Sequence, residues 1–112
     1  MIKVSIYMTA DDLITGFQLS GHALYSEYGK DIVCAAVSAL VINTINSIEK
    51  FTSDRFSLKQ DENEGIIEFH MISPFSNESN LLLSSLALGL EGIAQEYSDK
   101  YIKISRVKSK SI

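Results

Sequence analysis

The order in which strand-like and helix-like apolar patterns follow one another constrains the fold of this chain most strongly. Residues 2–8 alternate apolar and polar side chains, and residues 13–20 resume the alternation after an acidic turn, so both segments predict half-buried strands. Gly16 is expected to mark a bulge or a close backbone approach. Apolar residues then recur at helical spacing over residues 32–50. The strand side chains predicted to share inward faces are Ile2, Val4, Ile6, Met8, Leu13, Thr15, Phe17 and Leu19.

The second half of the chain repeats this order. Residues 55–59 and 66–72 predict a hairpin around a charged turn, and a second helix capped at Ser76-Asn77 is expected to run to about Tyr97. Residues 101–107 predict a final strand. The order strand, strand, helix, strand, strand, helix, strand is typical of an α+β two-layer sandwich, with two helices on one face of a mainly antiparallel sheet. We expect all 112 residues to form one domain.

Two glycines, Gly89 and Gly92, lie inside the second predicted helix. Glycine in a helix interior costs about 1 kcal/mol relative to alanine. The pair therefore indicates close packing against another helix or a second subunit, and this helix is our candidate for a subunit interface.

Composition limits the partners and the compartment of the chain. The net charge of -4, from 10 basic and 14 acidic residues, argues against nucleic acid as a partner. The single cysteine cannot form an intramolecular disulfide, and a thiol that must stay free favours the reducing cytoplasm. The N-terminus lacks signal-peptide features, and no uninterrupted apolar run reaches the roughly 20 residues of a membrane helix. We therefore expect a cytoplasmic protein with no membrane partner.

The single cysteine, Cys34, lies where the first predicted helix should begin. Asp31 is a suitable N-cap, so the helix is expected to start at Ile32 with Cys34 in its first turn. Unpaired backbone N–H groups and the dipole of a helix start favour a thiolate, which predicts a nucleophile. The alternative is a buried apolar thiol, since free cysteine is among the most buried residue types, and the local pattern does not separate the two.

A candidate base, His22, follows the second predicted strand, twelve positions before Cys34. A histidine can accept the thiol proton near neutral pH and return it to a leaving amine. Residues 21–31 predict a mobile loop, which would have to fold back to bring the two side chains together. The candidate hinge and substrate-gating residues of this loop are Gly21, Tyr25, Tyr28 and Gly29.

Ser38 lies one helical turn beyond Cys34, where its hydroxyl could orient a substrate, a water or the histidine. Bonding of that hydroxyl to the helix backbone is an equal alternative. The second histidine, His70, is expected on the exposed face of its strand and receives no catalytic role. Two histidines and one cysteine give no usual metal-ligand spacing, and no phosphate-binding glycine loop is present, so no metal or cofactor is expected.

The residues around the cysteine resemble the ribosomal-processing cysteine protease family Prp. The resemblance extends over the whole chain, and the motif that carries it is Gly21-His22-Ala23, Gly29 and the run Asp31-Ile32-Val33-Cys34-Ala35-Ala36-Val37-Ser38. It implies a cytoplasmic bacterial endopeptidase, usually a homodimer. Such an enzyme removes a short N-terminal extension from the twenty-seventh protein of the large ribosomal subunit, and it cuts after an aromatic residue.

By the same resemblance, Cys34 is the nucleophile and His22 is the general base, while Asp31 and Ser38 occupy motif positions of unassigned role. Backbone N–H groups at the helix start, including that of Cys34, would stabilise the oxyanion. Two other classes stay open: a noncatalytic module that binds a ribosomal protein or RNA, and a redox sensor. Replacing Cys34 separates these classes, because only the protease needs it together with His22 for peptide cleavage.

Overall fold

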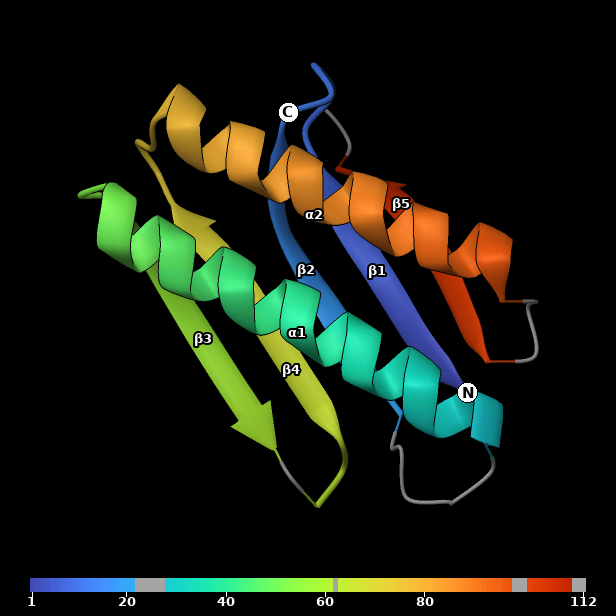
Figure 1. Cartoon of the computed structure of the whole chain (residues 1–112). Coiled ribbons are helices and arrows are strands. Elements are labelled where there is room, and N and C mark those ends of the chain that lie inside the picture. Colours follow the sequence, from blue (N-terminus) through green and yellow to red (C-terminus); the bar gives the residue numbers. More distant parts are fainter. Residues whose placement is uncertain (22–27, 62, 98–100, 110–112) are drawn as a thin grey trace.

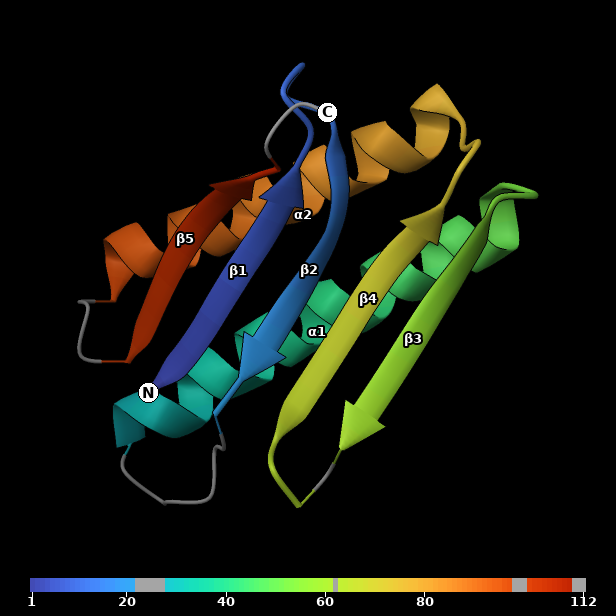
Figure 2. The same ribbon diagram turned by 180° about the vertical axis from the view of Figure 1, so that it is seen from behind.

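The computed structural model describes residues 1–21, 28–61, 63–97 and 101–109, and of residues 28–31 only the backbone. Two helices lie side by side on one face of a five-stranded sheet (Figure 1), and no described element covers the other face (Figure 2). The predicted α+β sandwich is confirmed. Its elements are β1 (Ile2–Met8), β2 (Ile14–Ser20), α1 (Tyr28–Phe51), β3 (Arg55–Asp61), β4 (Ile66–Ile72), α2 (Asn77–Glu96) and β5 (Ile102–Lys108).

The sheet has the strand order β3-β4-β2-β1-β5. Three neighbouring pairs are antiparallel, namely β1 with β2, β2 with β4, and β3 with β4, whereas β5 runs parallel to β1. The sheet is therefore mainly antiparallel, as predicted. The parallel pair arises because α2 runs back along the sheet after β4. The strand β5 therefore begins at the same end of the sheet as β1 and runs in the same direction.

The hydrophobic core lies between the sheet and the two helices. All four apolar side chains predicted to face inward from β1 are buried. Buried helix residues recur every three or four positions, which turns one stripe of each helix toward the sheet. The aromatic rings of Phe17 and Phe69 stack at the centre with 5.0 Å between their centroids. The principal buried helix residues are Val33, Val37, Val41, Ile48, Leu83, Leu86 and Leu90.

The start of β2 turns a different face toward the core than predicted. Leu13 is 44% exposed, whereas Ile14 is buried. The register of β1 against β2 shifts between Tyr7 and Met8, opposite Gly16. An extra residue in one strand reverses the side-chain alternation beyond it, so Ile14 takes the inward place predicted for Leu13.

Gly16 also marks a close approach of two strands. A Cβ atom at this position would lie 2.3 Å from the backbone oxygen of Phe69 on β4. The backbones of β2 and β4 thus come too close for any side chain here. The bulge and the close approach predicted for Gly16 are both present.

The second helix, α2, begins where predicted. Ser76 is its N-cap, and the Ser76 hydroxyl accepts a hydrogen bond from the backbone N–H of Ser79 at 3.3 Å. Tyr97 caps the other end. A Cβ atom at Gly89 would lie 2.9 Å from Cδ1 of Leu40 on α1, so this glycine lets the two helices pack closely, as predicted.

The first helix, α1, is long and apolar on average. By length and composition its segment Ile32–Phe51, with a mean hydropathy of 1.6, could cross a membrane. The segment also contains serine, asparagine, threonine and charged residues, so the expectation that no uninterrupted apolar run reaches this length is not contradicted. Val33, Val37 and Ile48 of the segment are fully buried against the sheet, so much of its apolar character belongs to the core.

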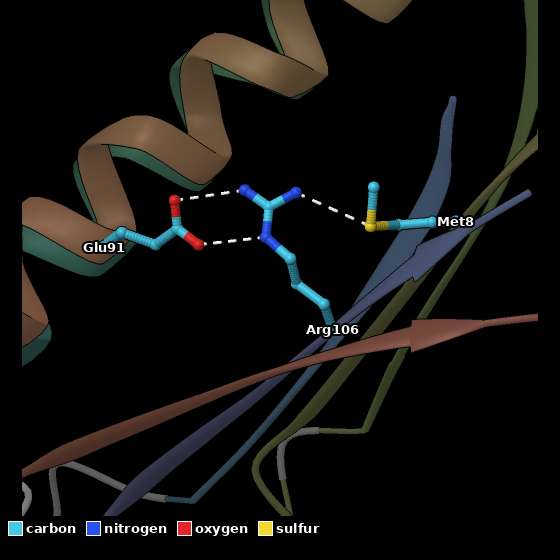
Figure 3. Close-up of polar contacts among 3 residues, drawn as sticks. All are labelled: Met8, Glu91 and Arg106. Atoms are coloured by element: carbon cyan, nitrogen blue, oxygen red, sulfur yellow. Dashed lines mark hydrogen bonds and ion pairs between the residues drawn. The ribbon is translucent and has the colours of Figure 1, made fainter. Parts of the chain in front are cut away.

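The β5 edge of the sheet is joined to α2 by Arg106 (Figure 3). Its guanidinium donates two parallel hydrogen bonds to the Glu91 carboxylate, at 3.0 Å from Nε and 3.1 Å from Nη2, and faces the Met8 sulfur at 3.5 Å. Hydrogen bonding to Glu91 raises the pKa of Arg106. Because both side chains are well exposed, the pair contributes no more than about 1 kcal/mol and mainly fixes the helix against the strand.

Candidate active site

Cys34 lies on α1, six residues after the helix begins. Its side chain is only partly buried and packs against the edge of the core, whereas Val33 and Val37 are fully buried. The sulfur lies 3.9 Å from the hydroxyl oxygen of Ser38, and either atom could donate a hydrogen bond. Cys34 and Ser38 therefore share one face of the helix, as predicted, and the thiol is accessible rather than enclosed in the core.

The helix itself begins four residues earlier than predicted, at Tyr28 rather than Ile32. Asp31 is therefore inside the helix and is not its N-cap, and Tyr28 and Gly29 belong to the helix rather than to a loop. Aspartate is favourable both at an N-cap and in a first turn, where the helix dipole attracts a carboxylate, so the residue type does not fix the start. Cys34 falls in the second turn, beyond the N–H groups that a helix start leaves unpaired. The prediction that Cys34 lies in the first turn of the helix is therefore wrong.

Cys34 and Ser38 form one side of a cavity of about 290 Å³ between α1 and the sheet. Its rim includes Gly21 and the end of β3, which continues to Asp61, two residues past its predicted end. This volume is at the small end for ligand sites and suits one or two side chains rather than a whole ligand. The apolar side chains that line it are Ile2, Leu19, Val37, Ile66 and Ile67.

Gly21 fixes the path of the chain where it leaves β2 at the cavity rim. Its φ of 113° lies in the region that favours glycine, and a Cβ atom would lie 2.3 Å from the backbone oxygen of Met1. Its N–H donates to the carbonyl of Gly65 at 3.1 Å. The chain is thus held beside the cavity immediately before His22. His22 and Tyr25 lie outside the described residues, so their catalytic and gating roles stay predictions.

The second histidine, His70, lies away from this cavity. It follows Phe69 on β4, and because Phe69 is buried against the helices, His70 points to the opposite face of the sheet. There its ring stacks on Tyr7 with 5.3 Å between centroids, and its Nε2 lies 3.7 Å from the Glu68 carboxylate. His70 therefore cannot act as the base for Cys34, and His22 is the remaining histidine of the sequence.

The polar side chains at the cavity are the thiol of Cys34, the hydroxyl of Ser38 and the amide of Gln60. Within the described parts of the chain, no three histidine, cysteine, aspartate or glutamate side chains gather closely enough to hold a metal ion. A thiol beside an apolar cavity can carry nucleophilic chemistry once a base removes its proton.

A family model described as cysteine protease Prp matches residues 1–103, which include Cys34 and every residue that lines the cavity. The chain belongs to the cysteine protease Prp family. It is accordingly a cysteine protease. The ribosomal processing cysteine protease Prp of Staphylococcus aureus is 33% identical over 99 residues, which cover 88% of this chain and 93% of the relative. That of Bacillus subtilis is 30% identical over 103 residues, covering 88% and 92%.

Solved structures of the Prp protease from S. aureus have the same fold. One, in complex with a substrate peptide, superposes with a TM-score of 0.88 at 30% identity and covers 96% of this chain and 100% of that chain. Another, in complex with a covalently linked product peptide, has a TM-score of 0.85 at 32% identity, with the same coverage. In the S. aureus protein, the Prp fold therefore holds a peptide.

Proposed function

We propose that this chain removes a short N-terminal extension from the twenty-seventh protein of the large ribosomal subunit, cutting after an aromatic residue. The observation that carries the proposal is the partly exposed thiol of Cys34 at the side of an apolar cavity. The relatives from S. aureus and B. subtilis are named ribosomal processing proteases, which supports a ribosomal substrate. The net charge of -4 suits a basic ribosomal protein as the partner.

In this proposal Cys34 is the nucleophile and His22 is the general base. His22 directly follows Gly21, which borders the cavity, and His70 faces the other side of the sheet. The 3.9 Å separation between the Cys34 sulfur and the Ser38 hydroxyl supports a positioning role for Ser38. Asp31 is a second candidate for a supporting role, now from within the helix rather than from its cap.

The proposed reaction has two stages. His22 removes the thiol proton, the sulfur of Cys34 attacks the carbonyl carbon of the scissile peptide, and the C–N bond breaks as His22 protonates the leaving amine. Water, deprotonated by His22, then adds to the thioester, and the C–S bond breaks to release the new carboxylate and the thiol. The segment between Gly21 and Tyr28, which contains Tyr25, is proposed to gate the substrate during this cycle.

The cavity beside the thiol supports the proposed aromatic preference. Its lining is mostly apolar, and its volume of about 290 Å³ accepts a phenylalanine-sized side chain. Burial of such a ring contributes roughly 1.5–3 kcal/mol, which is enough to favour aromatic over small residues next to the cut. A peptide with alanine in place of the aromatic residue should be cleaved much more slowly.

We also propose that the protein is a cytoplasmic homodimer that associates through α2. Leu81 and Leu88, seven residues apart on one face of this helix, are 69% and 73% exposed. A Cβ atom at Gly92 would meet no described residue within 4 Å, so close packing among the described parts of the chain accounts for Gly89 but not for Gly92. A Leu88→Gln variant should sediment as a monomer where the wild type sediments as a dimer. A wild type that stays monomeric at high concentration would contradict this part of the proposal.

The test of the proposed function is cleavage of a synthetic peptide that carries the extension and the first residues of the mature ribosomal protein. The wild type should cut after the aromatic residue, and both Cys34→Ala and His22→Ala should lose cleavage while still binding the peptide. Ser85→Ala, an exposed serine on α2, is the matched control and should cleave as the wild type does. Equal binding by all four proteins without any cleavage would favour a noncatalytic binding module instead.

A further inference from the structure

Leu58 on β3 is exposed although it lies on the face of the sheet that carries the core. It pairs directly with Phe69 on β4, so the two side chains share the helix-side face. Phe69 is fully buried, whereas Leu58 is 39% exposed. Figure 1 shows that α1 lies over the start of β3 and diverges from the strand toward its end, so no described helix covers the end of β3. An apolar side chain of the inward face is therefore left at the surface.

The helix α1 presents an apolar side chain to the same opening. Leu40 faces α2, because its Cδ1 lies 2.9 Å from the place of a Cβ atom at Gly89. Ile42 lies about 200° further round the helix, on the side of β3, and is 55% exposed. It follows Ser38 by one helical turn, as Ser38 follows Cys34, so the three side chains form one row along the helix.

Ile42 and Leu58, named here the apolar strip, continue the cavity beside Cys34. Gln60 lines that cavity and follows Leu58 by two residues, which places both on the same face of β3. Ser38 also lines the cavity and precedes Ile42 by one turn. A single exposed apolar residue is common on a protein surface, but two that flank one opening next to an accessible thiol indicate a binding surface.

The position of the strip along α1 determines which substrate residue reaches it. Cys34 and Ile42 are eight residues apart, which corresponds to about 12 Å along a helix. An extended peptide advances about 3.3 Å per residue, so it covers this span in about three to four residues. A side chain that contacts the strip therefore belongs to a residue about three or four positions from the bond that is cut.

We propose that Ile42 and Leu58 are specificity-determining residues that bind an apolar side chain of the substrate about three or four positions from the cut. This inference rests on the proposed peptidase function and adds to it a second recognition element besides the aromatic residue. Both residues act by binding alone and take no part in bond making or breaking. Their replacement should raise KM and leave kcat nearly unchanged. Because both side chains are exposed, polar replacements should leave the fold intact.

The experiment uses peptides that share one aromatic cleavage position. In each pair of peptides, one further position on either side of the cut carries leucine in one peptide and serine in the other. For the wild type, kcat/KM should be about tenfold higher for leucine at the third or fourth position on one side, as expected for partial burial of a leucine. In Leu58→Gln and Ile42→Gln this ratio should fall to about threefold or less. Val107→Gln, which changes a similarly exposed apolar residue on the far edge strand β5, should keep the wild-type ratio.

Two results would overturn the inference and leave the peptidase function intact. One is cleavage by the wild type with no leucine preference away from the cut, or with a preference that both strip variants keep. The other is a strip variant that turns a dimer into a monomer but keeps the preference, because the strip would then contact a second copy of the chain. If the wild type cleaves none of the peptides, the proposed function fails and the inference fails with it.

Discussion

The two ends of the helical layer use their polar side chains in opposite ways. At the Asp54 end, where α1 stops and α2 starts, the Asp54 carboxylate accepts hydrogen bonds from the backbone N–H of Ser76 at 3.0 Å and from the hydroxyls of Ser76 and Ser79. These bonds, with that from the Ser76 hydroxyl the largest cause, lower the pKa of Asp54. Each polar group here stabilises the junction between the two helices.

At the Cys34 end, where α1 starts, the polar groups border a cavity instead. Among the described residues, the sulfur of Cys34 makes one polar contact, which is long, at 3.9 Å from the Ser38 hydroxyl. The contrast indicates that local stability is concentrated at the Asp54 end, while the Cys34 end keeps its reactive groups accessible. Catalytic regions commonly contradict the rules of stable packing in this way.

The largest effect is expected from Cys34→Ala. Loss of the nucleophile should lower kcat/KM for the peptide by at least about a thousandfold. Because the thiol is only partly buried, the free energy of unfolding should change by less than about 1 kcal/mol. Peptide cleavage and urea unfolding of the same preparation measure both quantities. If Cys34→Ala lowered the free energy of unfolding but kept its activity, Cys34 would have a structural role rather than a catalytic one.

Ser79→Ala should have the opposite effect. The Ser79 side chain is fully buried, and its hydroxyl donates to the Asp54 carboxylate, so its removal should destabilise the fold by about 1–2 kcal/mol. Cleavage per folded molecule should not change. Ser84→Ala, an exposed serine on the same helix, serves as the control and should remain within about 0.5 kcal/mol of the wild type. An unchanged urea midpoint for Ser79→Ala would contradict the stabilising role of the polar groups at the Asp54 end.

The pH dependence of stability should also originate at the Asp54 end. Since folding lowers the pKa of Asp54, the carboxylate stabilises the fold above its ordinary pKa of about 4, and this contribution is lost as the pH falls through the folded-state value. Asp54→Asn should therefore be less stable than the wild type at neutral pH, and the two should converge below about pH 4. Urea unfolding across this range measures the gap, and a gap that stays constant with pH would contradict the assignment.

The smallest effect is expected from Gly92→Ala. The helices run antiparallel, so the last turns of α2 belong to the Cys34 end (Figure 1). No described residue lies within 4 Å of a Cβ atom at this position, and alanine should stabilise the helix by up to about 1 kcal/mol. Urea unfolding at low protein concentration tests this gain. At high protein concentration the gain should shrink or reverse, because the proposed dimer packs a second subunit near Gly92, and a loss of stability at low concentration would contradict the prediction.

Local signals in the sequence predicted the Asp54 end well. Pro74 ends the preceding strand, and Ser76 lies two residues later. A serine N-cap depends only on neighbouring residues, so the start of α2 was predicted correctly. The strand alternation of residues 2–8 was equally reliable, because each inward side chain is buried by the same layer of helices. The sequence also indicated the shared face of Cys34 and Ser38, which requires only the helical repeat.

The structure of the Cys34 end was harder to predict, because it depends on contacts between segments that are distant in the sequence. The start of α1 was misplaced because an aspartate suits both a cap and a first turn, and the inward face of Leu13 was misassigned because the bulge depends on the partner strand. The cavity is built from β1, β2, β4, the end of β3 and α1, and its apolar residues have the periodicity of ordinary core residues. Asp61 was assigned to a charged turn, whereas β3 continues through it because it pairs with Ile66 on β4.

The most direct test of Cys34 as the nucleophile is the mass of the protein during turnover. The wild type is mixed with the substrate peptide and quenched in acid within the first turnover. The protein is then digested, and the mass of the fragment that contains Cys34 is measured by mass spectrometry. The proposed mechanism predicts that this fragment gains the mass of the N-terminal product as a thioester, and that His22→Ala forms the adduct far more slowly. Peptide cleavage without any adduct, or with an adduct on another residue, would contradict Cys34 as the nucleophile.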